Sequence, residues 1–289
     1  MDLSSRTKLC GVIGDPIEHS LSPKMFNAAF RANDLDFTYV AMNVKKNGLA
    51  KAIEGMKALN IHGLNVTIPH KVKVVGYLDR VDPDAKMIGA VNTILNANGK
   101  LEGFNTDGTG AVRAIEESGT SLEGRNVVLI GSGGAARAIA FTFSNRVGKL
   151  TILNRHVHKS EKLATELTKK TGRKVYFEGL RKEALERAIS EADMLVNATS
   201  VGMSPNCDAS ILDGSLLRRD LVVFDIVYNP PETKLLKEAT SIGAKAVNGI
   251  GMLVHQGGEA FRIWTSKEAP VRLMREVVTE ELSRLSGKT

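Results

Sequence analysis

The stretch Asn65 to Lys71, N-V-T-I-P-H-K, places a lysine just after an apolar run that ends at a proline. A lysine in a reaction centre can donate a proton or stabilise developing negative charge, whereas a solvated lysine does neither. Asn65 and Thr67 are two residues apart, so their side chains leave a strand on the same face. The stretch alone is compatible with an ordinary strand end or with a catalytic lysine, and it indicates no role for His70.

Two serines stand at another boundary between a predicted strand and a predicted helix. The run G-D-P-I-E-H-S-L-S-P contains Ser20 and Ser22, followed directly by Pro23. Two hydroxyl donors beside a helix N-terminus can bind a carboxylate, because the helix dipole also favours an anion there. The simpler alternative is that Ser22 only caps the helix, with Pro23 at its first position.

A glycine-rich turn gives the clearest ligand signal. The run G-S-G-G-A-A-R begins at Gly131, follows the apolar strand 126–130 and opens a helix. In the pattern G-x-G-x-x-A, Gly131 makes the tight turn, Gly133 lets the backbone approach a pyrophosphate, and Ala136 lets the helix pack close to the strand. A tight turn without a ligand is the alternative. The strand, helix and second strand around the motif favour dinucleotide binding.

The end of the second strand of this unit indicates the type of dinucleotide. An NAD site usually has an acidic residue there to bind the ribose hydroxyls. Here the strand ends in Asn154 and Arg155, followed by H-V-H-K to Lys159. Asn154 can bond the ribose, while Arg155 and Lys159 can contact a 2′-phosphate. We therefore expect NADP, although a solvated basic helix start would look similar.

The elements that position these residues alternate between strand and helix. Apolar runs predict strands at 9–13, 37–44 and 63–68, helices at 23–33 and 49–59, and a hairpin at 91–104 that turns at Asn98-Gly99. From residue 126 the alternation of strand and helix predicts a parallel sheet with helices on both faces. Two helices are predicted after Gly249. The 289 residues favour two α/β domains.

Composition excludes several classes of protein. The two cysteines indicate no disulfide framework, and the six histidines show no metal-ligand spacing, so we predict no metal. The net charge is +7, but the basic residues are interleaved with 32 acidic ones, which argues against nucleic acid and suits small anionic ligands. No apolar run approaches the ~20 residues of a membrane span. We expect a cytoplasmic protein; a homodimer is compatible with a sequence that leaves the oligomeric state open.

Several polar clusters at the edges of apolar runs resemble one family in order and spacing. They are N-V-T-I-P-H-K, G-A-V-N-T (89–93), G-F-N-T-D-G (103–108), G-S-G-G-A-A-R, N-A-T-S-V-G-M (197–203), D-I-V-Y-N-P (225–230) and N-G-I-G-M-L-V-H-Q-G (248–257). Together with the paired serines they closely resemble the shikimate dehydrogenase family, which includes shikimate/quinate dehydrogenases. The resemblance covers nearly the whole chain.

The resemblance implies a role for each matching residue. The catalytic pair would be Lys71 and Asp107. The substrate residues would be Ser20 and Ser22 at the carboxylate, Asn65, Thr67, Asn92 and Gln256 at the ring hydroxyls, and Tyr228 near the carboxylate end. The NADP would be surrounded by Gly131, Ser132, Gly133, Gly134, Ala135, Asn154, Arg155, His156, Lys159, Ile226 and Gly249. The chain departs from the family at His156, where threonine is frequent, and at Lys159, where arginine is frequent; His156 would contribute fully only when protonated.

The resemblance also implies the reaction and the domains. The reaction would be reversible NADPH-dependent reduction of 3-dehydroshikimate to shikimate, in chorismate and aromatic amino acid biosynthesis. A lysine ammonium near Asp107 would give the alkoxide a proton or stabilise its charge. Residues 1–107 with 248–289 would form an α/β substrate domain with a mainly parallel sheet, its C-terminal helices packing back on it. Residues 108–247 would form a Rossmann-type NADP-binding domain.

Three alternatives remain open at this stage. A quinate/shikimate dehydrogenase using NAD shares most of the motifs, although the missing acid after Leu153 argues against NAD. A non-catalytic dinucleotide-sensing regulator on the same fold would be expected to have lost Lys71 or Asp107. A folate-linked dehydrogenase would explain the glycine turn but neither the paired serines nor G-F-N-T-D-G.

Overall fold

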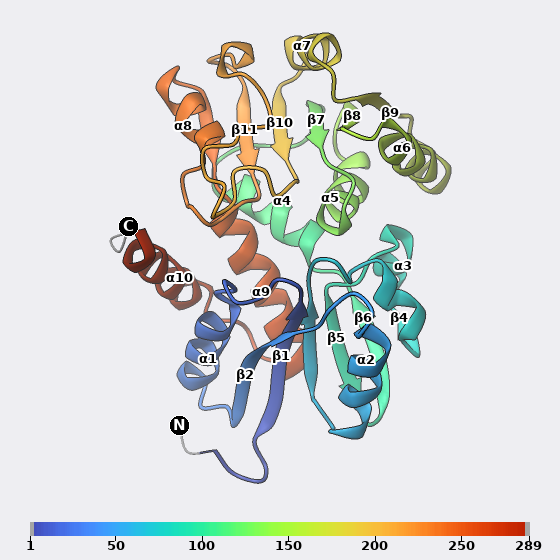
Figure 1. The fold of residues 1–289 in the computed structure, drawn as a ribbon, viewed down its shortest axis with the longest axis vertical. Helices are drawn as coiled ribbons and strands as arrows, with labels where there is room; N and C mark the ends of the chain where they lie inside the picture. The colour runs from blue at the N-terminus through green and yellow to red at the C-terminus, as the bar shows by residue number, and fades with distance from the viewer. Residues whose placement is uncertain (1–2, 287–289) are drawn as a thin grey trace. The chain divides into compact units, whose positions relative to one another are not determined.

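The computed structural model describes residues 3–286 of the chain. These residues form two compact units. The first unit contains the chain as far as Thr106 and again from Val254 onward, and the second contains Asp107–Leu253. Figure 1 labels the helices and strands of each unit.

The first unit is built on a six-stranded mixed sheet with the strand order β2-β1-β3-β5-β6-β4. The strands are β1 Lys8–Gly14, β2 Phe37–Asn43, β3 Gly63–Val66, β4 Arg80–Val81, β5 Thr93–Ala97 and β6 Lys100–Phe104. β1 is parallel to β2 and β3, whereas β5 is antiparallel to β3 and β6. The β5–β6 hairpin turns at Asn98 and Gly99, which have positive φ angles of 54° and 88°, as the Asn-Gly pair predicts.

Short helices connect these strands and complete an apolar core. They are α1 Ser22–Ala32, α2 Leu49–Ala58, the 3₁₀ helix η1 Lys73–Tyr77, and α3 Pro83–Ile88. On α2, Leu49, Ile53 and Met56 recur at helical spacing and pack in one cluster with Leu64 and Ile94 of the sheet. The periodicity that predicted α2 is therefore the pattern of its buried face.

The last part of the chain also packs into the first unit. It forms the helices α9 Gly249–Thr265 and α10 Val271–Ser286. Near the end of α9, Trp264 Nε1 donates a 3.0 Å hydrogen bond to the carbonyl of Ile94, and the ring of Phe261 lies 5.5 Å from that of Phe30. A Cβ at Gly63 would come within 2.4 Å of the Trp264 ring, so this strand position needs glycine. The predicted packing of the C-terminal helices is confirmed.

The second unit has a six-stranded, entirely parallel sheet with the order β12-β11-β10-β7-β8-β9. Its strands are β7 Asn126–Ile130, β8 Lys149–Asn154, β9 Val175–Gly179, β10 Met194–Asn197, β11 Val222–Asp225 and β12 Lys245–Val247. The chain fills one side of β7 first and then the other, which is the Rossmann order. The switch between β7 and β10 is where such sheets bind ligands.

Helices cover both faces of this parallel sheet. They are α4 Asp107–Glu117, α5 Gly134–Ser144, α6 Val157–Thr171, α7 Lys182–Ser190 and α8 Lys234–Ser241, with the 3₁₀ helix η2 Gly214–Leu216. Val127 and Leu129 of β7 share a core with α4, α5 and α6, whereas Val128 and Ile130 share one with α7 and α8. Burial on both faces explains why this strand reads as a continuous apolar run.

The predicted two-domain α/β fold is confirmed, with differences in detail. α1 begins at Ser22, and β3 ends at Val66 rather than at Ile68. The sequence did not predict η1, β4 or α3, which are too short to show a clear periodicity. β12, three residues long, was missed for the same reason.

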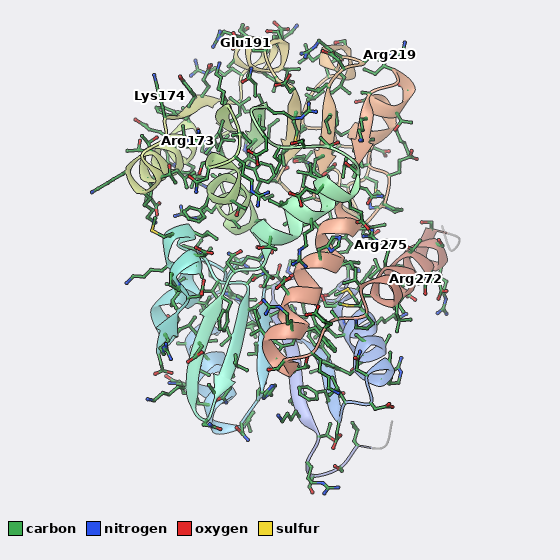
Figure 2. All side chains as sticks on the ribbon, turned by 180° about the vertical axis from the view of Figure 1, so that it is seen from behind. Arg173, Lys174, Glu191, Arg219, Arg272 and Arg275 are labelled. Carbon is green, nitrogen blue, oxygen red and sulfur yellow. The ribbon has the colours of Figure 1, made fainter. Side chains whose placement is uncertain are left out.

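The charged side chains are spread over the surface of each unit. In the second unit, Arg173, Lys174, Glu191 and Arg219 are exposed, and Figure 2 shows Glu191 and Arg219 away from the adjacent Arg173 and Lys174. This agrees with the dispersed charges of the sequence. Among residues 3–286, no helix is both long and apolar enough to span a bilayer.

Candidate active site

The N-terminus of α1 carries the two predicted carboxylate-binding serines. Leu21 is the N-cap residue, and no side chain makes a capping hydrogen bond there. Ser20 Oγ accepts a 3.3 Å hydrogen bond from the backbone N–H of Ser22, which keeps the two serines together. Ser22 therefore does not act as the helix cap. Both serines lie at a helix end whose dipole favours an anion.

Asn65 lies inside the first unit, where three other residues hold its side-chain amide. Only 7% of the residue is exposed. Its Oδ1 accepts a 2.7 Å hydrogen bond from the Tyr39 hydroxyl, and its Nδ2 donates to the Asn92 carbonyl and to Thr93 Oγ1 at 3.2 and 3.1 Å. Tyr39, which sequence reasoning missed, thus fixes the orientation of this amide.

The turn after β3 carries Thr67 and Lys71 and is anchored by His70. The Thr67 carbonyl accepts from the backbone N–H of His70 at 2.9 Å, and the Lys71 carbonyl accepts from that of Val91 at 2.8 Å. His70 is fully buried, and its Nε2 lies 2.6 Å from the carbonyl of Val44, just after β2. Because a carbonyl oxygen only accepts, Nε2 carries the proton. His70 therefore has a structural role, which is to fix the turn that carries Lys71.

Asn92 joins three segments that are far apart in the sequence. It is 2% exposed, and its Nδ2 donates to Thr106 Oγ1 at 2.9 Å and to Gln256 Oε1 at 3.3 Å. Its Oδ1 accepts from the backbone N–H of Thr106 at 2.8 Å. The structure therefore brings the predicted residues Asn92 and Gln256 together and adds Thr106, whose cluster the sequence singled out without assigning it a role.

Two predicted residues of the reaction lie in the second unit. Asp107, the first residue of α4, is 3% exposed. A Cβ on the following Gly108 would come within 2.1 Å of Thr142 Oγ1, so α4 lies tightly against α5 beside Asp107. Tyr228 is half-buried after β11, and its burial raises the pKa of the phenol above its usual range.

The glycine turn after β7 has a geometry that fits a dinucleotide. Gly131 has a φ of 122°, and a Cβ there would lie 2.7 Å from the carbonyl oxygen of Ala198, after β10. Gly133 is exposed, and a Cβ there would meet nothing within 4 Å, which leaves space for a pyrophosphate to approach. Ala136 is fully buried against the sheet. The three positions match the three requirements of the motif.

The end of β8 is tied to this glycine turn. Asn154 Nδ2 donates to Ser132 Oγ at 2.8 Å, and Asn154 Oδ1 accepts from the backbone N–H of His156 at 2.9 Å. Arg155, His156 and Lys159 are exposed, and their side chains form no hydrogen bond or ion pair with another residue in the range 3–286. Their donors therefore remain available for a phosphate.

The backbones of Ile226 and Gly249 are in close contact. Gly249 is the first residue of α9, and a Cβ on it would lie 2.3 Å from the Ile226 carbonyl oxygen. The Gly249 N–H donates to the Val227 carbonyl at 3.2 Å, and the Ile226 N–H donates to the Asn197 carbonyl at 3.1 Å. These contacts fix the segment that follows β11.

A buried network of hydrogen bonds around Asp225 also holds the segment that follows β11. The fully buried carboxylate of Asp225 accepts from Asn197 Nδ2 at 2.9 Å, from the Val227 N–H at 3.0 Å and from Thr233 Oγ1 at 2.7 Å. Burial nevertheless raises the pKa of Asp225 to about 6, outweighing these three hydrogen bonds. The sequence analysis noted the motifs N-A-T-S and D-I-V-Y only as part of the family resemblance, and it did not predict this network.

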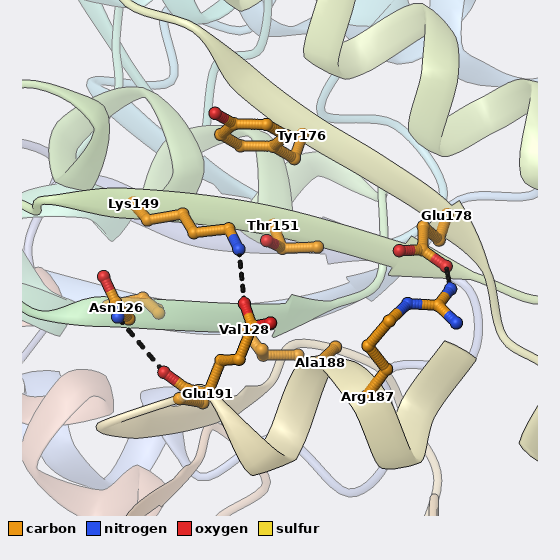
Figure 3. A pocket seen from close by; sticks show the side chains of 11 residues that line it. Asn126, Val128, Lys149, Thr151, Tyr176, Glu178, Arg187, Ala188 and Glu191 are labelled. Atoms are coloured by element: carbon orange, nitrogen blue, oxygen red, sulfur yellow. Dashed lines mark hydrogen bonds and ion pairs between the residues drawn. The ribbon is translucent and has the colours of Figure 1, made fainter. Parts of the chain in front are cut away.

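A separate pocket of about 110 Å³ lies on the α7 side of the same sheet (Figure 3). Asn126 and Lys149, the first residues of β7 and β8, line it. Its charged groups pair with one another, Lys149 with Glu191 at 2.7 Å and Arg187 with Glu178. Since the glycine turn follows the other end of β7, this pocket is not part of the dinucleotide site.

Across residues 3–286, no group of three His, Cys, Asp or Glu side chains could hold a metal ion.

Comparison with known proteins identifies the family. Three family models match the chain: the shikimate dehydrogenase substrate binding domain at residues 12–94, shikimate / quinate 5-dehydrogenase at 113–234, and the shikimate 5′-dehydrogenase C-terminal domain at 249–279. The NADP(+) shikimate dehydrogenase of Methanocaldococcus jannaschii is 45% identical over 283 residues, which are 98% of this chain and 100% of that protein. The chain belongs to the shikimate dehydrogenase family.

Solved structures of shikimate dehydrogenases have the same fold. A crystal structure of one in complex with NADP⁺ has a TM-score of 0.92 and 45% identity, covering 97% of this chain and 98% of that one. A Listeria monocytogenes shikimate 5-dehydrogenase in complex with shikimate and NAD has a TM-score of 0.88 and 39% identity, covering 96% and 98%.

Proposed function

We propose that this protein is an oxidoreductase that catalyses the reversible, NADP-dependent reduction of 3-dehydroshikimate to shikimate in chorismate biosynthesis. The observation that carries the proposal is the convergence of Asn92, Thr106 and Gln256 in a chain whose full-length relatives are named for this activity. A ring with several hydroxyls and one carboxylate needs several fixed polar groups together with an anion site.

The substrate would be held by residues on fixed elements. Ser20 and Ser22 bind its carboxylate at the N-terminus of α1, where the hydroxyl donors and the helix dipole favour an anion. Its ring hydroxyls bond to Asn65, Thr67, Asn92 and Gln256, and Tyr228 lies near its carboxylate end. The hydrogen bonds from Asn92 to Thr106 and Gln256 support this assignment, because buried partners hold the amides in one orientation before binding.

Lys71 and Asp107 form the proposed catalytic pair. The carbonyl oxygen of the substrate gains negative charge as its carbon is reduced, and the Lys71 ammonium stabilises that charge or donates a proton to it. Asp107 keeps Lys71 cationic and orients it. The buried bond from His70 to Val44 supports this role by fixing the turn that carries Lys71.

The cofactor residues surround an NADP. When bound as NADPH, it supplies the hydride. Gly131, Ser132, Gly133, Gly134 and Ala135 contact the pyrophosphate, and Asn154 the adenosine ribose. The 2′-phosphate is contacted by Arg155, His156 and Lys159. The rest of the cofactor site is lined by Ile226 and Gly249. The open space at Gly133 supports this arrangement, as do the exposed side chains of Arg155, His156 and Lys159, which have no hydrogen-bonding partner among residues 3–286.

An assay of shikimate and quinate, each with NADP⁺ and NAD⁺, tests the function. Nicotinamide absorbance gives kcat/KM for all four combinations, and shikimate with NADP⁺ should exceed the others by at least about tenfold. A higher value for quinate with NAD⁺ would instead support the quinate/shikimate dehydrogenase. Tight dinucleotide binding without any turnover would support a regulator on this fold.

A further inference from the structure

The start of α6 and the two residues before it carry several groups that can be cationic. Arg155, His156, His158 and Lys159 fall within five consecutive positions, and all four are exposed. The imidazole rings of His156 and His158 lie beside each other, with centroids 5.8 Å apart and planes inclined by 40°. Only three of these residues have a proposed role, so the position of His158 beside His156 is an additional observation.

The helix end itself leaves these side chains available. His156 is the N-cap residue of this 15-residue helix, but its ring makes no capping hydrogen bond, and the first turn contains no acidic residue. None of the four side chains forms a hydrogen bond or an ion pair with another residue between positions 3 and 286. The unpaired N–H groups and the dipole of the helix add to the same positive end.

The histidine pair lies at the adenosine end of the proposed cofactor site. The backbone N–H of His156 is held by Asn154, whose amide also donates to Ser132 in the glycine turn. In a Rossmann unit, the residues directly after the second strand contact the ribose 2′ position, which bears the phosphate in NADP and a hydroxyl in NAD. A charge on these rings therefore acts on the atoms that distinguish the two cofactors.

The charged groups around the histidine pair include acids and bases, and those on the neighbouring elements are largely paired with one another. On α6, Glu161 is one turn beyond His158, and Lys162 follows it. On the elements that pack against α6, Glu178 is paired with Arg187 and Arg137 with Glu166. Arg181 lies near Gly179, the last residue of β9, and adds another cation.

We propose that His156 and His158 are a pH-dependent specificity element that strengthens binding of NADP, relative to NAD, as the pH falls from about 8 to about 6.5. This inference rests on the proposed function, because it concerns the cofactor of that reaction. Two imidazolium groups 5.8 Å apart repel each other, and a dianionic phosphate beside both offsets the repulsion. Binding of NADP is then accompanied by proton uptake, whereas binding of NAD is not.

Calorimetric titration of the full chain with NADP⁺ and with NAD⁺ at pH 6.5 and pH 8 tests the proposal. We expect NADP⁺ to bind about fivefold more tightly at the lower pH and NAD⁺ to change less than twofold. Repeating the titrations at pH 7 in two buffers of different ionisation enthalpy should show proton uptake with NADP⁺ only. The 2′-phosphate itself stays mainly dianionic in this range, since its second pKa is about 6.

Two variants separate the histidine pair from the permanent cations. The double variant H156N/H158N alters only exposed side chains and should lose both the pH dependence and the proton uptake. R155A should weaken NADP⁺ binding by a similar factor at both pH values, because arginine stays charged. The proposal is overturned if the ratio of NADP⁺ affinity to NAD⁺ affinity in the wild-type protein does not change with pH. It is also overturned if that ratio changes with pH in H156N/H158N as much as in the wild type. A clear preference for NADP⁺ with no pH dependence leaves the proposed function intact, whereas no preference at either pH contradicts both.

Discussion

The hydroxyl of Tyr39 donates a 2.7 Å hydrogen bond to Oδ1 of Asn65 in the interior of the first unit. The Tyr39 ring also stacks on Phe26, with centroids 4.5 Å apart and planes inclined by 5°. Because Oδ1 is bound to Tyr39, Nδ2 must point to Asn92 and Thr93, as observed. The orientation of a proposed substrate residue is therefore set by a tyrosine 26 positions earlier.

Tyr39→Phe should test this relationship, because it removes the hydroxyl and keeps the stacked ring. We expect the free energy of unfolding to fall by ~1–3 kcal/mol, since a buried acceptor loses its donor. The KM for shikimate should rise if Asn65 binds a ring hydroxyl. Tyr77→Phe, at an exposed tyrosine, is the matched control and should change neither quantity. An unchanged KM in a destabilised Y39F protein would remove Asn65 from the substrate site.

Lys71→Ala should lower kcat by roughly 10²- to 10⁴-fold, the usual contribution of a positioned acid or base. The dissociation constant for shikimate should change far less, because the carboxylate and most hydroxyls keep their proposed partners. Steady-state kinetics together with calorimetric shikimate binding measure the two effects separately. Lys73→Ala, two residues further along, is the control for loss of a nearby charge. Equal losses in turnover and in binding would contradict the catalytic role.

The glycine turn offers a comparison between two substitutions of the same size. Gly131→Ala should destabilise the second unit by at least ~2 kcal/mol, because φ is 122° and the new Cβ would press on the Ala198 carbonyl. Gly133→Ala should leave stability unchanged, since its Cβ meets only open space, but should weaken NADP⁺ binding. Thermal unfolding and cofactor titration distinguish the two effects. Unchanged NADP⁺ affinity in G133A would mean that the pyrophosphate does not approach this position.

The features that could be predicted from the sequence differ physically from those that could not. Features set by local patterns could be predicted, such as the Asn98-Gly99 hairpin, the helix α2 and the strand–turn–helix at Gly131, because neighbouring residues determine them. Contacts between distant segments could not be predicted from local patterns: Asn92 and Gln256 are 164 positions apart, and only the family resemblance assigned both to one substrate site.

Individual buried residues were the hardest to interpret. His70 looked incidental because a histidine beside a lysine has no periodic signature, yet it is fully buried and bonded to Val44. Asp225 could be read from the family resemblance as part of a motif, but its three buried donors come from β10, the segment after β11 and the start of α8. Such networks depend on the tertiary fold and leave no local trace in the sequence.

The buried carboxylate of Asp225 gives the second unit a predictable pH dependence. Its pKa is about 6 in the folded protein and 3.8 ordinarily, so between these values the folded state binds more protons than the unfolded state. Stability from this group is therefore fully present below about pH 4 and decreases as the pH rises to about 6. At ~1.4 kcal/mol per pH unit, the interval corresponds to about 3 kcal/mol.

Asp225→Asn should remove this dependence while keeping the shape of the side chain. The amide oxygen can still accept from Val227 and Asn197, and its NH₂ can donate to the Thr233 hydroxyl. Denaturant unfolding at pH 4.5 and pH 7 should show that the wild-type protein loses stability relative to D225N as the pH rises, by about 2 kcal/mol, because part of the loss has already occurred at pH 4.5. Asp208→Asn, at an exposed carboxylate, is the control. A difference between wild type and D225N that stays constant over this range would mean that Asp225 remains ionised in the folded protein throughout.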